Sequence, residues 1–271
     1  MPFADVNAVR LYYEEQGVGE PLICVQGLSA SSAAWVLVVP AFAARHRTLV
    51  FDNRDVGQSV RMDGPYAIGD MAADTLALAD HLEIPEFHLL GVSMGGAIAQ
   101  HVALRAPERV RTLSLGVSWA GAGPYAGEKT RLLSLEAERF TREEFTDSLM
   151  LLNFSEAFYE SAEGVAFVRQ MMLDYPYEQE PEAFRRQADA CAGHDLRGRL
   201  DALTMPVHVI AGEHDIMLPR WKSEELAAQI PGSRLTVVPK APHGLNIERA
   251  EEFNDAVLGF IAEHSQAPAP A

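Results

Sequence analysis

The sequence predicts an α/β protein built on a mostly parallel β-sheet. Apolar, β-branched runs at residues 22–25, 87–90 and 206–212 are typical of strands that are buried on both faces. Each run ends in a turn that contains glycine, and amphipathic stretches with helical spacing separate the runs. The 271 residues are 48% hydrophobic, which suits one core with an insertion better than two independent domains.

Eight strands and several helices are expected along the chain. Strands are predicted at residues 6–10, 11–15, 22–25, 48–51, 87–90, 110–117, 206–212 and 233–239. Helices of the core are predicted at residues 31–45, 68–82, 97–104, 221–229 and 249–264. Pro40 is expected to bend the first of these helices. In helix 68–82, the hydrophobic spacing places Asp70, Asp74 and Asp80 on the outward face.

A helical insertion is predicted between the sixth and seventh strands. Regular structure breaks near residues 119–124, and amphipathic helical stretches follow at residues 132–140, 142–152, 164–175 and 182–192. We therefore divide the chain into a core of residues 1–120 and 200–265 and a cap of residues 121–199. Residues 266–271, rich in Ala and Pro, are expected to be a disordered tail.

The turn after the strand at residues 87–90 carries the sequence Gly91-Val92-Ser93-Met94-Gly95-Gly96. A Gly-x-Ser-x-Gly turn between a strand and a helix holds its serine in a strained conformation, with Oγ exposed at the strand end. Free N–H groups at the helix N-terminus stabilise negative charge that develops on a substrate oxygen. Ser93 is therefore the candidate nucleophile.

Two later loops supply candidate partners for Ser93. Asp215 follows the strand at residues 206–212, and His243 follows the strand at residues 233–239. A serine hydroxyl needs a base, and imidazole has a suitable pKa near neutral pH. A buried carboxylate would hold the imidazole in one tautomer and stabilise its cation. Asp215 is the preferred acid, and neighbouring Glu213 stays open as an alternative.

These motifs resemble the α/β-hydrolase fold. The resemblance rests on residues 91–96, 212–215 and 241–243 and on the turn at residues 51–59. It implies a mostly parallel eight-stranded sheet, helices on both faces and a helical cap inserted after strand six. It also implies that the backbone N–H groups of Leu28 and Met94 form the oxyanion hole. Gln26 stands where the family usually has histidine, and Asp55 where it often has glycine, so the local backbone could differ there.

The resemblance also suggests where a substrate pocket would lie. Trp119, just past the end of a strand, is a candidate pocket residue, and so is Gly27 in the oxyanion loop. As a group, Phe154, Phe158, Met171, Met172 and Tyr175 are further candidates, although such stripes more often form core.

Composition excludes several classes of partner. The net charge of −16 and the sequence pI of about 4.9 disfavour nucleic acids and anionic membrane surfaces. No signal peptide or membrane span is recognised, and Cys24 and Cys191 are expected to be reduced thiols, so a cytoplasmic location is the expectation. No metal-ligand spacing and no cofactor motif is found. A small-molecule substrate is expected, and a homodimer is left open as the oligomeric state.

The leading functional prediction is a serine hydrolase that cleaves an ester or lactone of a small, mostly uncharged substrate. Among family members, the sequence looks most similar to 3-oxoadipate enol-lactonases and small carboxylesterases. One alternative is a cofactor-free haloperoxidase that acts as a perhydrolase, because such enzymes have a similar Ser-Met-Gly-Gly turn. Another is a small-molecule receptor with vestigial turnover.

Overall fold

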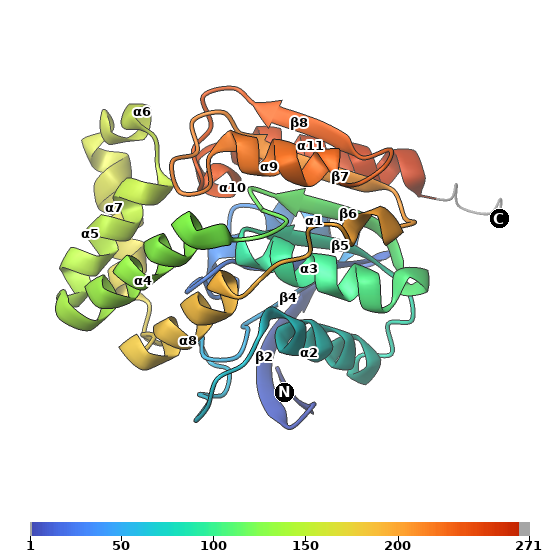
Figure 1. Ribbon diagram of the computed structural model, residues 1–271, viewed down its shortest axis with the longest axis horizontal. Helices are drawn as coiled ribbons and strands as arrows, with labels where there is room; N and C mark the ends of the chain where they lie inside the picture. Colours follow the sequence, from blue (N-terminus) through green and yellow to red (C-terminus); the bar gives the residue numbers. More distant parts are fainter. Residues whose placement is uncertain (1, 266–271) are drawn as a thin grey trace.

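The computed structural model describes residues 2–265 and shows one eight-stranded sheet flanked by helices (Figure 1). The predicted tail at residues 266–271 lies outside the described residues. The strands are β1 Phe3–Val6, β2 Val9–Gln16, β3 Pro21–Val25, β4 Arg47–Phe51, β5 Phe87–Val92, β6 Val110–Gly116, β7 Val207–Gly212 and β8 Arg234–Val238. The strand order is β1-β2-β4-β3-β5-β6-β7-β8. β2 pairs antiparallel with β1 and β4, and every other neighbouring pair is parallel.

The helices alternate with the strands and form a separate group between β6 and β7. They are α1 Val39–Ala43, α2 Ile68–His81, α3 Met94–Arg105, α4 Gly123–Arg139, α5 Arg142–Asn153, α6 Glu156–Tyr159, α7 Ala162–Asp174, α8 Pro181–Ala192, α9 Arg220–Ala228, α10 Leu245–Glu248 and α11 Ala250–His264. Short 3₁₀ turns lie at Ser32–Trp35, Pro107–Arg109 and Leu200–Ala202.

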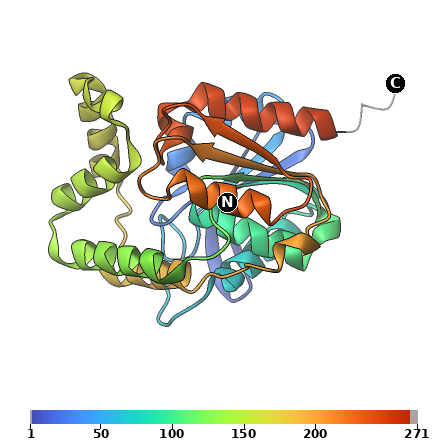
Figure 2. The ribbon, with the colours of Figure 1, turned by 45° about the horizontal axis from the view of Figure 1, so that its top comes forward.

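The sheet separates two hydrophobic cores. One core joins α2, α3 and α9 to one face, with Met71, Ile98 and Leu226 buried in it. The other core joins α1 and α11 to the opposite face through Phe42 and Phe253. Figure 2 shows α11 and α3 on opposite sides of the sheet. Burial on both faces explains why β3 and β5 are almost continuously apolar.

Helices α4–α8 project beyond one edge of the sheet, and we call them the cap (Figures 1 and 2). They contain two small hydrophobic clusters of their own, one around Leu133 and Phe184 and the other around Met150 and Phe154. The arrangement places the cap next to the carboxyl ends of the central strands, where the loops with the predicted site residues lie.

Several element predictions need correction. Residues 31–45 do not form one bent helix: a 3₁₀ turn ends at Trp35, and α1 starts at Val39 with Pro40 in its first turn, where a missing N–H costs nothing. The opening strands turn at residues 7–8, where both residues have positive φ. The first cap helix begins at Gly123 rather than at residue 132, and the short helix α6 was not predicted.

Asp74 is also placed differently from the prediction. It is 2% exposed rather than outward-facing. Its carboxylate accepts two hydrogen bonds from the Arg54 guanidinium, at 2.7 and 2.8 Å, and one from Asn7 Nδ2. Burial raises the pKa of Asp74, and the bonds from Asn7 and Arg54 oppose that shift. A cation from a distant loop thus makes burial of this helix carboxylate possible.

Candidate active site

Ser93 occupies a strained turn between β5 and α3. Its φ and ψ are 56° and −120°, a conformation that non-glycine residues rarely adopt. The turn is tight enough that a Cβ on Gly95 would overlap the Val25 carbonyl oxygen. The Ser93 N–H donates to Gly116 O at 2.9 Å, which ties the turn to β6. Packing on both sides therefore holds the hydroxyl at the end of the central strand.

The loops after β7 and β8 bring His243 and Asp215 to Ser93. His243 Nε2 lies 3.0 Å from Ser93 Oγ, and His243 Nδ1 lies 2.7 Å from Asp215 Oδ2. The side chains of Asp215 and His243 are almost fully buried, whereas Ser93 is partly exposed. The backbone braces both loops, because His214 N donates to Ala241 O at 2.9 Å. The three predicted residues therefore form one continuous chain of hydrogen-bonding groups.

Glu213 points away from this chain. Its side chain is 40% exposed, and its Oε2 accepts a hydrogen bond from the Lys240 amide. In contrast, the second oxygen of Asp215 accepts a bond from Leu218 N at 2.8 Å, which fixes the carboxylate plane. The geometry thus favours Asp215 over Glu213 as the partner of His243.

The loop after β3 lies beside Ser93. A Cβ on Gly27 would lie 3.1 Å from Ser93 Cβ, so Gly27 lets this loop approach the serine. Gln26 Oε1 accepts a bond from the Gly27 N–H at 2.9 Å, which shows how an amide braces the loop where the family usually has histidine. Within residues 2–265, the Leu28 and Met94 N–H groups have no protein acceptor. Both amides are thus available to a ligand oxygen.

The turn after β4 is held by buried charges. Asp52 accepts hydrogen bonds from Ser32 N and Gln58 N, which oppose the rise in its pKa caused by burial. Asp55 has a φ of 70° and is wholly buried, so it keeps a backbone conformation that glycine favours. Its carboxylate binds the Arg186 guanidinium through two bonds of 2.8 Å, and it also accepts bonds from Met62 N and Tyr66 Oη. Asp55 thereby ties the core to cap helix α8.

A cavity of about 410 Å³ extends from Ser93 and His243 into the cap. Its lining is mostly apolar, and it includes all but one of the predicted group: Phe154, Met171, Met172 and Tyr175 line it, and Phe158 does not. Arg142 is the one lysine or arginine among the lining residues, and it donates to the backbone carbonyls of Met172 and Tyr175. Gly27 lines the cavity beside Ser93.

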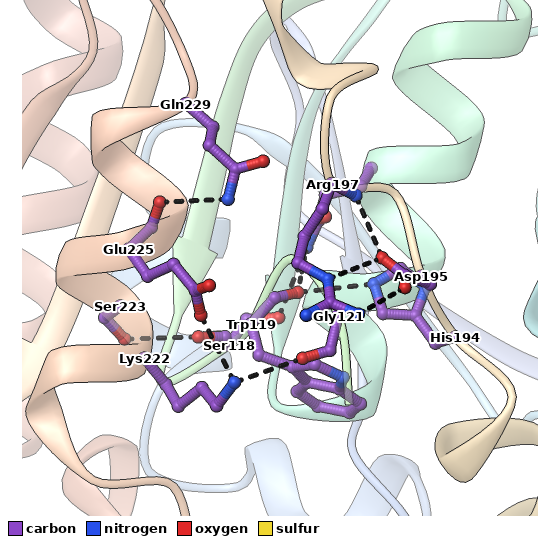
Figure 3. A network of polar contacts seen from close by, with 11 residues as sticks. Ser118, Trp119, Gly121, His194, Asp195, Arg197, Lys222, Ser223, Glu225 and Gln229 are labelled. Atoms are coloured by element: carbon purple, nitrogen blue, oxygen red, sulfur yellow. Dashed lines mark hydrogen bonds and ion pairs between the residues drawn. The ribbon is translucent and has the colours of Figure 1, made fainter. Parts of the chain in front are cut away.

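Trp119 does not line that cavity. It is 5% exposed and packs edge-on against His194 at the base of the cap. There the chain leaves β6 and later returns toward β7, and the two segments pair through Gly121 and Asp195 (Figure 3). His194 approaches the Trp119 carbonyl, and Lys222 donates to the Gly121 carbonyl at 3.2 Å. In the structure, Trp119 belongs to the packed base of the cap rather than to the pocket.

Three further residues near the site were not identified from the sequence: Arg186 and Gln187 of α8, and Gln179 before it. Gln187 is wholly buried and bonds to the loops that follow β3 and β4. Nothing in the local pattern of α8 marks these side chains, because polar residues are normal on a helix surface. The one available signal was Asp55, whose buried charge requires a cation from elsewhere in the chain.

The described residues contain no group of three or more His, Cys, Asp or Glu side chains that could hold a metal ion. Among the same residues, no helix is both long and apolar enough to cross a membrane.

Comparisons with known proteins agree on one family. The model for the alpha/beta hydrolase fold matches residues 20–250. A putative carbamate hydrolase, RutD, from Azorhizobium caulinodans is 30% identical, with 98% of this chain and 100% of that protein covered. A putative non-heme bromoperoxidase, BpoC, from Mycobacterium tuberculosis is also 30% identical, and the match spans 94% of this chain and 98% of that protein. The crystal structure of an enol-lactonase from Burkholderia xenovorans superimposes with a TM-score of 0.89 at 28% identity, over 96% of this chain and 100% of that one.

Proposed function

This chain belongs to the α/β hydrolase fold family, and we propose that it is a serine hydrolase that cleaves a carboxylic ester or a lactone. The observation that carries the proposal is the alignment of Ser93, His243 and Asp215, with contacts of 3.0 and 2.7 Å beside a mostly apolar cavity. A base within hydrogen-bond reach of a serine, and oriented in turn by a carboxylate, is the arrangement that nucleophilic catalysis requires.

In the proposed acylation step, His243 Nε2 takes the proton from Ser93 Oγ as the oxygen attacks the carbonyl carbon. The resulting oxyanion accepts hydrogen bonds from the Leu28 and Met94 N–H groups, which have no protein acceptor among the described residues. Asp215 stabilises the imidazolium. His243 then gives its proton to the leaving alkoxide, which departs as an alcohol or, from a lactone, remains attached to the acyl group.

Deacylation reverses these roles with water as the nucleophile. His243 removes a proton from water, hydroxide adds to the acyl-enzyme carbonyl, and the collapsing intermediate returns Ser93 Oγ as the leaving group, protonated by His243. The carboxylic acid is then released. Cap residues such as Phe154 and Met171 line the cavity beside Ser93 and reduce the access of bulk water to the acyl-enzyme.

The cavity favours neutral substrates. Arg142, the cation in its lining, already donates to two backbone carbonyls and lies 3.7 Å from Glu178. A substrate carboxylate would therefore have to replace existing bonds rather than meet a free guanidinium. The net charge of −16 adds a long-range repulsion against anions. A small, mostly apolar ester or lactone suits this pocket.

The test is hydrolysis of p-nitrophenyl acetate, butyrate and octanoate by the wild type and by Ser93→Ala, with the pre-steady-state burst recorded. We expect a burst for the wild type and a loss of about 10⁴-fold or more in kcat for Ser93→Ala, because the nucleophile is removed. A correctly folded wild type without Ser93-dependent turnover would overturn the proposal.

A perhydrolase is the second candidate, and the similarity to a putative non-heme bromoperoxidase supports it. The acyl-enzyme would be the same, but hydrogen peroxide would replace water and release a peracid. Bromination of a dye in the presence of acetate and peroxide separates the two. Bromination that exceeds ester hydrolysis would favour the perhydrolase.

A further inference from the structure

A cap residue contacts the loop that carries one of the proposed oxyanion donors. Gln187 of α8 is 0% exposed, and its Oε1 accepts a hydrogen bond from the Ser29 N–H at 3.0 Å. Its Nε2 donates to the Arg54 carbonyl oxygen at 2.9 Å. A backbone N–H can only donate and a carbonyl can only accept, so these two partners fix the orientation of the amide.

The loop after β3 depends on such contacts for its shape. Ser29 has a φ of 66°, a left-handed conformation that costs free energy in a residue with a side chain. The N–H groups on either side of Leu28 are both engaged, that of Gly27 by Gln26 and that of Ser29 by Gln187. These two amide side chains therefore hold the backbone on both sides of the Leu28 N–H.

Helix α8 is itself fixed against the core. Arg186 binds the buried carboxylate of Asp55 through two bonds of 2.8 Å. Gln179 Nε2 donates to both Gln187 Oε1 and Asp55 O, at 3.1 and 3.0 Å. The amide oxygen of Gln187 thus accepts two hydrogen bonds, from Ser29 and Gln179. Arg186, the residue before Gln187, anchors helix α8 to the core.

We propose that Gln187 is a positioning residue for the oxyanion hole. From the cap it fixes the loop at residues 27–29, so that the Leu28 N–H faces the developing negative charge beside Ser93. The oxyanion hole is then complete only while α8 is docked on the core, which couples the cap to the chemistry. This inference rests on the proposed serine hydrolase function.

The kinetic test compares Gln187→Met with Gln187→Glu. Methionine is similar in length but cannot accept the Ser29 N–H bond, whereas glutamate retains an acceptor. Loss of a whole oxyanion donor costs about 10²–10³ in kcat, so displacement of one should cost about tenfold or more. We expect this loss in the kcat of Gln187→Met for p-nitrophenyl butyrate, with KM changed less than about twofold. Gln187→Glu should regain only part of the lost kcat, because a carboxylate accepts the Ser29 N–H bond but cannot donate to the Arg54 carbonyl.

The affinity for an inhibitor that forms a tetrahedral adduct with Ser93 is a second measurement, and a general loss of stability would not change it. A trifluoromethyl ketone forms an oxyanion on Ser93, so its affinity should fall by the same factor as kcat/KM in Gln187→Met. Ser155→Ala is the matched control, because Ser155, at the start of cap helix α6, bonds to Glu248 of α10 and has no hydrogen bond to the loop at residues 27–29 within the described part of the chain. It should leave both quantities within about twofold. A rise in KM with an unchanged kcat, or an equal effect of Ser155→Ala, would contradict the proposal.

An NMR measurement on the wild type keeps the inference testable without any turnover. The Ser29 amide should exchange with solvent far more slowly than an unbonded surface amide, and Gln187→Met should remove this protection while Ser155→Ala leaves it intact. An unprotected Ser29 amide in the wild type would overturn the positioning role even if Ser93-dependent hydrolysis is found. A protected amide without Ser93-dependent hydrolysis would instead show that the proposed function fails and that Gln187 has no oxyanion hole to position.

Discussion

At the scale of single residues, the two carboxylates of the loop after β7 differ sharply in their surroundings. Asp215 is buried and lies 2.7 Å from His243 Nδ1. Glu213 is exposed and accepts a bond from the Lys240 backbone. The sequence favoured Asp215 and left Glu213 as an alternative, because the directions of the two side chains cannot be read from residues that are only two positions apart.

This difference predicts the outcome of a paired substitution. Asp215→Asn should lower kcat by about 10⁴-fold, because an amide favours the wrong imidazole tautomer and cannot stabilise the cation. Glu213→Gln should change kcat less than about threefold. Steady-state hydrolysis of p-nitrophenyl butyrate, with thermal melting to verify folding, measures both. Comparable losses in the two variants would refute the assignment of Asp215.

Backbone strain at Ser93 illustrates what local sequence predicts well. Glycine at positions 91 and 95 indicated a turn too tight for side chains, and the structure has close backbone approaches at both positions. Gln26 illustrates the limit. Its amide bonds to the next residue's N–H, a contact that depends on a side-chain rotamer and not on any pattern in the sequence.

At the scale of elements, one ion pair connects the cap with the core. Asp55 and Arg186 are 131 residues apart in sequence, and the Asp55 side chain is wholly buried. Asp55 appeared in the sequence as a departure from the family's usual glycine. In the structure, residue 55 keeps the left-handed backbone conformation, and the Asp55 carboxylate binds Arg186 of α8, the residue next to Gln187.

Removing the cation from this pair should be costly. Arg186→Met leaves the Asp55 carboxylate buried without its partner, and we expect the free energy of unfolding to fall by about 3 kcal/mol. The matched control is Arg169→Met, since the pair of Arg169 with Asp147 is largely exposed and should be worth less than about 1 kcal/mol. Urea denaturation at pH 7.5 measures both values. A similar small loss in the two variants would argue against a buried anchor.

Helix and strand positions were predicted better than the contacts between elements. The apolar runs located the central parallel strands because burial on both faces leaves a clear pattern. Asp74 was placed outward from helical spacing alone, but Arg54 binds it from a loop 20 residues away. Pro40 was expected to bend a helix and instead lies in the first turn of α1, because the preceding residues form a separate 3₁₀ turn.

At the scale of the whole molecule, buried histidines link stability to pH. Burial lowers the pKa of His101, His194 and His208 to about 4. His208 on β7 is the simplest of them, since it is 1% exposed. Its Nε2 lies in hydrogen-bond contact with Thr236 Oγ1 at 2.8 Å, and its Nδ1 has no partner within the described residues. The sequence could not show this, because a histidine in an apolar strand does not reveal its protonation state.

The sign of the resulting pH effect follows from the two pKa values. Between pH 6.5 and about 4, unfolded His208 binds a proton that the folded protein excludes, so its contribution to stability is full above pH 6.5 and is lost as the pH falls. The slope reaches at most about 1.4 kcal/mol per pH unit for one group. Buried Asp52 and Asp74, whose pKa values are raised, act in the opposite direction, so the net curve alone cannot isolate the histidine.

A comparison of variants isolates the contribution of His208. His208→Gln removes the titrating group, so its free energy of unfolding should fall less steeply than that of the wild type between pH 7 and pH 5, by up to about 1.4 kcal/mol per pH unit. Thr236→Val is the control, because it removes the hydroxyl partner but keeps the buried imidazole, and it should retain the steep slope. Urea denaturation at half-unit pH steps gives the three slopes. Parallel curves for the wild type and His208→Gln would show that this histidine is protonated equally in the folded and unfolded states.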